Sequence, residues 1–150
     1  MNPSIRIANL EDEKYIIDCV KDSYSKYINR IGKKPAPMLD DYKTKIIDSW
    51  VHVFEEQEKI IGISELIPRS DHLYLGNIAV HPSFQGQGIG RQLMLYAESI
   101  AKSQGFTEIR LFTNEAMYEN LAIYSKYGYL ETGRKTEDGY KRVYFSKPIL

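Results

Sequence analysis

The sequence predicts a single α+β domain in which helices cover a mixed, mostly antiparallel sheet of six or seven strands. Three observations carry this prediction. Three strand-like segments follow one another between residues 50 and 80 with short polar turns, which is typical of an antiparallel meander. A strand, a helix and a second strand then run from residue 73 to 113, and such a crossover makes its two strands parallel. Finally, Asp138-Gly139 separates two strand-like segments and predicts a hairpin.

The composition is that of one water-soluble domain spanning residues 1–150. Hydrophobic residues make up 43% and charged residues 27% of the chain, and 20 Lys and Arg balance 20 Asp and Glu. This balance predicts no nucleic-acid partner and no membrane partner. No secretion signal and no membrane-length apolar run are visible. Cys19 is the only cysteine, which excludes an internal disulfide and, with no His cluster, predicts no metal site and a cytoplasmic protein.

The first half of the chain predicts a strand over residues 4–8 and then two helices. Asn9 is the expected N-cap of the first helix, with Asp12 in the capping-box position, and Gly32 ends this helix after about residue 30. Two prolines in residues 33–38 exclude a helix there. Asp40 is the expected cap of the second helix, over residues 41–49.

From residue 50 the spacing of apolar residues changes from about 3.6 to 2, which indicates strands. The remaining elements are predicted in this order: strands around 51–53, at 60–67 and at 73–80, a helix over 89–104, a strand over 107–113, a helix over 116–126, and strands over 129–136 and 140–146.

The glycine-rich turn over residues 81–91 joins a strand to the start of a helix. Glycines there let several backbone N–H groups point into one concavity, and the helix dipole favours an anion at that place. The sequence contains no Gly-x₄-Gly-Lys-Ser/Thr string, so a P-loop is excluded. A dinucleotide-binding loop is excluded too, because Arg91 stands where its third glycine would be.

What remains is Gln85-x-x-Gly88-x-Gly90, which resembles the pyrophosphate-binding loop of the GCN5-related N-acetyltransferases (GNAT family). A second motif, over residues 113–129, is similar to the Asn/Tyr helix of that family, with Asn120 and Tyr124 four residues apart on one helix face. The order of strands and helices also resembles that family over the whole chain. The resemblance implies a central parallel strand pair that splays to admit acyl-CoA.

The resemblance further implies a site for acetyl-CoA and no metal. The backbone N–H groups of Gly86, Gln87, Gly88, Ile89, Gly90 and Arg91 would hold the pyrophosphate, with Gln85 at its edge. Ile78, Ala79 and Val80 would pair with the pantetheine arm as an added strand does. Asn120 would hydrogen-bond that arm, and Asn114 would line the same slot.

Acyl transfer to an amine requires a neutral amine, a donor for the oxyanion and a proton for the leaving thiolate. The resemblance places Tyr124 beside the thioester sulfur as the general acid, and a backbone N–H within residues 77–80 as the oxyanion donor. Glu65 is the candidate general base, acting directly or through water; the alternative is a strand residue in solvent.

The acceptor side is expected to be formed by the first two helices and their connection. Tyr27, Met38, Tyr42 and Asn77 are the candidate acceptor-binding residues. A small primary amine, an amino-acid derivative and a peptide N-terminus remain open as acceptors, as does an acyl group longer than acetyl.

The prediction is therefore an acetyl-CoA-dependent N-acetyltransferase with direct attack in a ternary complex. The alternative is a catalytically silent acyl-CoA sensor or interaction module. A two-fold homodimer is the default expectation for the assembly.

Overall fold

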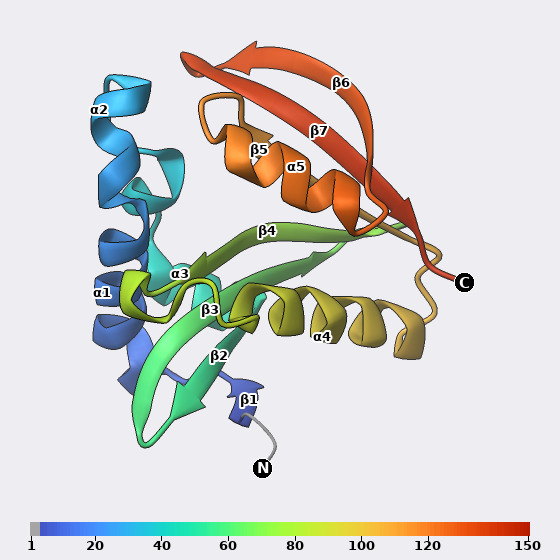
Figure 1. Ribbon diagram of the computed structural model, residues 1–150. Helices are drawn as coiled ribbons and strands as arrows, with labels where there is room; N and C mark the ends of the chain where they lie inside the picture. Colours follow the sequence, from blue (N-terminus) through green and yellow to red (C-terminus); the bar gives the residue numbers. More distant parts are fainter. Residues whose placement is uncertain (1–3) are drawn as a thin grey trace.

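The computed structural model describes residues 4–150, which form one seven-stranded sheet in the order β1-β2-β3-β4-β5-β7-β6 (Figure 1). The strands are β1 Ser4–Ile7, β2 Trp50–Glu56, β3 Lys59–Pro68, β4 Leu73–Val80, β5 Glu108–Asn114, β6 Leu130–Glu137 and β7 Tyr140–Pro148. The helices are α1 Glu13–Tyr24, α2 Ile28–Ile31, α3 Tyr42–Asp48, α4 Ile89–Ser103 and α5 Tyr118–Lys126. Only β4 and β5 are parallel neighbours among the described strands, so the predicted mixed, mostly antiparallel sheet is confirmed.

The capping box at the start of the first helical segment is present as predicted. The side chain of Asn9 accepts the N–H of Glu11, and the Asp12 carboxylate accepts the N–H of Asn9, both at 2.9 Å. The segment is not one helix, however. A 3₁₀ turn over Ser25–Tyr27 separates α1 from α2, which ends at Gly32 with φ +89°.

Two local predictions in the next segment were wrong. The N-cap of α3 is Asp41, whose carboxylate accepts the N–H of Thr44 at 3.3 Å, whereas Asp40 forms an ion pair with Lys45 at 3.6 Å. Ala36–Leu39 is a 3₁₀ helix, although Pro37 lies within it and Pro35 precedes it. Proline is tolerated in a first helical turn, because its missing N–H would have no partner there.

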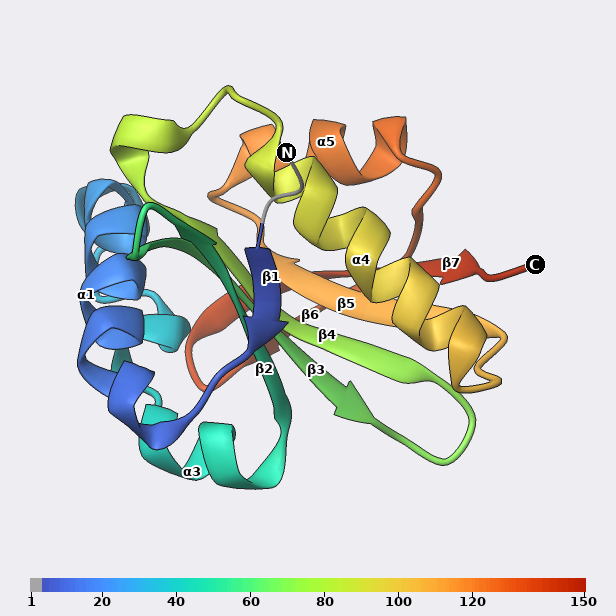
Figure 2. The ribbon, with the colours of Figure 1, turned by 90° about the horizontal axis from the view of Figure 1, so that it is seen from below.

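Helices cover both faces of the N-terminal part of the sheet (Figure 2). On one face α1 and α3 pack through Ile16, Val20 and Tyr42 against β2, β3 and β4. On the other face α4 packs through Leu93, Met94 and Ala97. Within residues 4–150, no helix has the length and apolarity needed to cross a membrane.

A β-bulge in β4 separates this strand from β5. In the β3–β4 ladder Leu66 pairs with Leu75 and Glu65 pairs with Asn77, so Gly76 is the extra residue. The pairing of β4 with β5 ends at Leu75, although both strands continue. Because a bulge bends and twists its strand, it accounts for the divergence of the parallel pair, and the expected splay is confirmed.

The carboxylate of Glu65 occupies the space beside Gly76. A Cβ atom on Gly76 would lie 2.6 Å from Glu65 Oε1, which is closer than van der Waals contact permits. The carboxylate is 3% exposed and accepts hydrogen bonds from Lys45 Nζ at 2.9 and 3.0 Å and from Ser49 Oγ at 3.1 Å. Glycine therefore fits here beside a buried carboxylate that is held in place by Lys45 and Ser49.

We expect Gly76→Ala to lower the free energy of unfolding by about 1–3 kcal/mol, because the added methyl group must displace Glu65. Gly133→Ala is the matched control, since a Cβ at this position in β6 would meet nothing within 4 Å. Urea unfolding of both variants measures the difference. Equal stability of the two variants would contradict this account of the bulge.

Candidate active site

A cavity of about 420 Å³ opens at the C-terminal end of β4. Its walls come from the C-terminal end of β4, the glycine-rich loop, the first turn of α4, and residues of α1 and α5. In Figure 1, α1, α4 and α5 lie around β4 and the loop that follows it. The bulge in β4 and the loop that follows this strand thus place the cavity.

The glycine-rich loop presents a row of free backbone amides. Gly86 and Gly88 have φ of +81° and +82°, a left-handed conformation that glycine adopts without strain. Within residues 4–150, no protein acceptor takes the N–H groups of residues 86–91. Since α4 begins at Ile89, its dipole adds partial positive charge at the same place. The loop is thus suited to bind a phosphate group.

Most of the expected acetyl-CoA residues line this cavity, and two do not. The lining includes Ile78, Ala79, Val80, Gln85, Gly86, Gly88, Ile89, Gly90, Arg91 and Asn120. The Gln87 side chain is exposed and does not belong to the lining. Asn114 lines a second cavity instead, and its side chain accepts the N–H of Ala116 at 2.8 Å.

At the free edge of β4, every second residue directs its backbone N–H and C=O groups toward the cavity. His81 donates its N–H to Ile61 of β3, so by the antiparallel alternation the backbone groups of Ile78 and Val80 point away from β3. Their carbonyls already face side-chain donors: Val80 O accepts Gln85 Nε2 at 2.9 Å, and Ile78 O lies 3.1 Å from the Tyr24 hydroxyl, which shares its one proton with Asn77. Their N–H groups are left for an added chain.

Tyr124 of α5 lies between the two cavities and lines both. Its ring packs against Tyr129 and Phe145, with centroids 5.9 and 5.7 Å away. Its hydroxyl makes no hydrogen bond within the described part of the chain. Burial raises the pKa of Tyr124 to about 12, so the hydroxyl keeps its proton at neutral pH.

The second cavity is small, about 60 Å³, and shares Tyr24, Ile78, Asn120 and Tyr124 with the first. The rest of its lining is Pro35, Ala36, Pro37, Leu75, Gly76, Asn77, Phe112, Thr113, Asn114, Met117, Tyr140 and Arg142. Of the four expected acceptor-binding residues only Asn77 lies there. Tyr27 lines the larger cavity, whereas Met38 and Tyr42 pack in the core between the sheet and α1.

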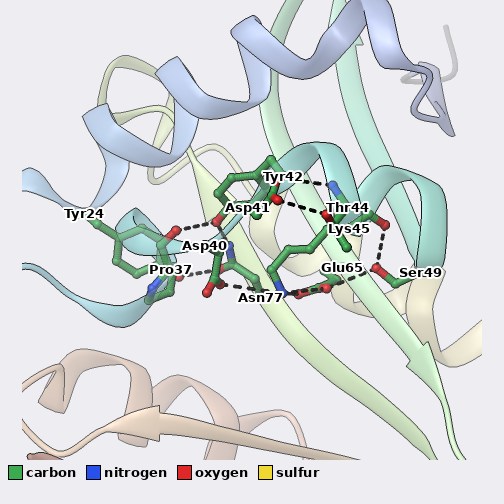
Figure 3. Close-up of polar contacts among 10 residues, drawn as sticks. All are labelled: Tyr24, Pro37, Asp40, Asp41, Tyr42, Thr44, Lys45, Ser49, Glu65 and Asn77. Atoms are coloured by element: carbon green, nitrogen blue, oxygen red, sulfur yellow. Dashed lines mark hydrogen bonds and ion pairs between the residues drawn. The ribbon is translucent and has the colours of Figure 1, made fainter. Parts of the chain in front are cut away.

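A polar network orients Asn77 (Figure 3). Its Oδ1 accepts the Tyr24 hydroxyl at 2.5 Å, and its Nδ2 donates to the Tyr42 hydroxyl at 3.2 Å. Tyr42 in turn donates to Pro37 O at 2.6 Å. Sequence reasoning missed Tyr24, because its spacing in α1 fits a core position. Desolvation raises the pKa of Tyr24 well above the usual tyrosine value.

Glu65 lines neither cavity. Figure 3 shows its carboxylate turned toward Lys45 and Ser49, beside the network of Asn77 but without a bond to it. Within residues 4–150, no group of three or more His, Cys, Asp or Glu residues is arranged to hold a metal ion. The assignment of Glu65 as the base has no direct geometric support.

A family profile described as "Acetyltransferase (GNAT) family" matches residues 14–129, which is most of the chain. The chain belongs to the GNAT acetyltransferase family. The resemblance seen in the glycine-rich loop and the Asn/Tyr helix is thereby confirmed, and so is the assignment to an acetyltransferase family.

Two relatives and one solved structure illustrate this membership. N-acetyltransferase family 8 member 3 of Rattus norvegicus is 32% identical over 54% of this chain and 38% of its own length. Spermidine N(1)-acetyltransferase of Thermoplasma acidophilum is 28% identical over 81% of this chain and 71% of its own. The PaiA N-acetyltransferase structure from Thermoplasma acidophilum, in complex with coenzyme A, superimposes with a TM-score of 0.81 at 21% identity, covering 99% of both chains. That structure shares the fold of this chain.

We expect Gly88→Ala to weaken binding of acetyl-CoA about tenfold, because Ala resists the left-handed conformation that aims the loop amides. Gly105→Ala is the matched control: Gly105 also has φ +82°, and at both glycines an added Cβ would meet no atom within 4 Å. Both variants should lose about 1 kcal/mol of stability. Isothermal titration with acetyl-CoA should separate them, and equal affinities would contradict the role of the loop.

We expect Glu65→Gln to act on stability, lowering the free energy of unfolding by roughly 1–3 kcal/mol because Lys45 loses its buried partner. A lost general base would instead lower kcat/KM by about 10²–10⁴-fold and remove the acidic limb of its pH profile. Urea unfolding and the pH profile of kcat/KM, measured on one preparation, distinguish the two roles. Loss of the acidic limb at unchanged stability would restore Glu65 as the base.

Proposed function

We propose that this protein transfers the acetyl group of acetyl-CoA to a primary amine by direct attack within a ternary complex. The observation that carries the proposal is the position of Tyr124 between two cavities, one of which has the free loop amides at its far end. The larger cavity is the proposed site of acetyl-CoA, and the smaller is the proposed site of the amine.

Acetyl-CoA would be held at both ends of its phosphopantetheine arm. The amides of residues 86–91 would bind the pyrophosphate, and the N–H group of Val80 would pair with the arm as a neighbouring strand does. Because Ile78 lines both cavities, its N–H is the proposed donor to the oxyanion that forms when the amine attacks.

Tyr124 would then donate a hydrogen bond to the sulfur as the C–S bond breaks. With a tyrosine pKa of about 12 and a thiol pKa of ~8.5, full transfer is uphill by roughly 3 to 4 pKa units, or about 5 kcal/mol. The Tyr124 proton would therefore be shared between the hydroxyl oxygen and the sulfur in the transition state. The nitrogen loses one proton as it becomes an amide, and this proton balances the one that the sulfur gains. The products are the acetylated amine and free coenzyme A.

The acceptor amine must be neutral before it attacks, and the two cavities offer it almost no base. Among the described residues, Glu119 is the only carboxylate that lines either cavity, and Arg30 holds it at 2.6 Å. This shortage of a base favours an amine that enters already neutral. The same shortage of a base favours the second candidate function, that of a catalytically silent acyl-CoA sensor.

Turnover decides between the two functions. The protein is incubated with acetyl-CoA and a panel containing small primary amines, amino acids, spermidine and a peptide with a free N-terminus, and release of the coenzyme A thiol is followed. Acetylated product confirmed by mass spectrometry supports the transferase. A raised melting temperature with acetyl-CoA, combined with no turnover on any amine, supports the sensor.

We expect Tyr124→Phe to lower the single-turnover rate of acetyl transfer by about 10²–10⁴-fold, because the leaving thiolate loses its donor. The affinity for acetyl-CoA and the melting temperature should stay unchanged, since the ring contacts remain. Tyr96→Phe is the control: Tyr96 lies on α4 against His52, outside both cavities. An unchanged single-turnover rate in Tyr124→Phe would rule out the general-acid role.

A further inference from the structure

Among the residues that the structure describes, one charged side chain and no acid line the smaller cavity. Its lining consists of aromatic, apolar and amide side chains, backbone, and Arg142 of β7. Arg142 stands opposite Asn114 in the β5–β7 ladder, at the end of β5 that diverges from β4. The charge of this cavity is therefore positive, which is unexpected for a site that would receive a polyamine.

The guanidinium of Arg142 is largely buried and most of its donors have no partner. The side chain is 16% exposed, and its guanidinium stacks over the ring of Phe112 at 4.3 Å. One nitrogen, Nη1, forms a long ion pair with Glu137 Oε1 at 3.6 Å, and that half-exposed carboxylate also accepts the hydroxyl of Tyr144. Within residues 4–150 the Arg142 side chain donates no hydrogen bond, although a guanidinium has five N–H groups and buried donors are normally paired.

We propose that the acceptor is a small amino acid-like molecule whose carboxylate binds Arg142 and whose amino group faces Tyr124; this inference rests on the proposed acetyl transfer. A carboxylate can accept two parallel hydrogen bonds from the planar guanidinium, and stacking on the Phe112 ring restricts the orientation of the guanidinium. Arg142 belongs to the lining of the smaller cavity only, so it is not a partner for the phosphates of acetyl-CoA in the larger one.

The size of the cavity agrees with a compact acceptor. About 60 Å³ holds a few non-hydrogen atoms, and the segment Pro35–Pro37 forms one of its walls. This segment is fixed to the β6–β7 hairpin, because the Tyr140 hydroxyl donates to Lys34 O at 2.6 Å. A folded polypeptide cannot enter such a space without moving that wall.

The same charge distribution discriminates between acceptors. A positive guanidinium disfavours an ammonium group beside it unless a negative group accompanies that ammonium group. A polyamine such as spermidine gains no acidic partner there and is repelled by Arg142. A carboxylate on the acceptor, by contrast, compensates the charge of Arg142.

Binding is tested on protein saturated with free coenzyme A, where no transfer can occur. Glycine, β-alanine, 4-aminobutyrate and phenylalanine are titrated by calorimetry, each against its carboxamide, with spermidine as a further ligand. We expect at least one amino acid to bind about 10- to 100-fold more tightly than its carboxamide, the loss expected for a hydrogen-bonded charged pair. Equal binding of every pair, or tightest binding of spermidine, would overturn the inference.

Variants of Arg142 locate the carboxylate. Arg142→Gln should remove the preference for the amino acid over its carboxamide, and Arg142→Lys should restore part of it, because lysine keeps the charge but not the two parallel bonds. Arg110→Gln is the matched control: Arg110 is an exposed arginine on β5 that pairs with Glu108, outside both cavities. A preference that survives in Arg142→Gln would also overturn the inference.

The two proposals fail in different ways. Carboxylate-dependent binding that needs Arg142, without turnover when acetyl-CoA replaces coenzyme A, supports this inference and removes the transferase function. Turnover of amines with no preference for a carboxylate supports the transferase and removes this inference.

Discussion

The divergence of β4 from β5 depends on one buried interaction, the ion pair of Glu65 and Lys45 beside Gly76. A glycine is the extra residue of the bulge because the Glu65 carboxylate lies where a side chain would be. Breaking such a pair leaves a charge without a partner in the interior, which costs more than the pair itself contributes. The bulge is thereby fixed at one residue of the strand, and with it the point at which the parallel pairing ends. The smaller cavity opens at this point, lined by Leu75, Gly76 and Phe112.

The bulge also changes the faces to which β4 directs its side chains. Without it, Leu75 and Asn77 would point to the same face of the sheet. With it, Leu75 packs in the core beneath α4, whereas Asn77 reaches the α1 side and bonds to Tyr24 and Tyr42. The hydrogen bond from Tyr24 to Ile78 O then connects α1 to the free edge of the strand. The wall between the two cavities is thus built from a helix and a strand that are distant in the sequence.

The sequence predicted those parts of the candidate site that lie within one local motif. The glycine loop and the pair of Asn120 and Tyr124 are each set by a few consecutive residues and by helical spacing, and the element order predicted the sheet. Tyr24, Arg142 and the role of Glu65 depend on which strands and helices meet, and no local pattern carries that information. Asp40 and Asp41 show the same limit on a smaller scale. Either residue can cap a helix, and only the folded structure shows that Asp41 caps α3 while Asp40 pairs with Lys45.

The burial of Tyr124 and the charge of Arg142 bear on the two proton transfers that acyl transfer would need. Burial raises the pKa of Tyr124, so its hydroxyl keeps the proton that the proposed mechanism shares with the leaving sulfur. The charge of Arg142 makes an ammonium group unfavourable beside it, so an acceptor without a negative group would bind poorly there. An acceptor that brings its own carboxylate would pair with Arg142, which is the charge pattern that fits a cavity where the described lining residues supply no acid.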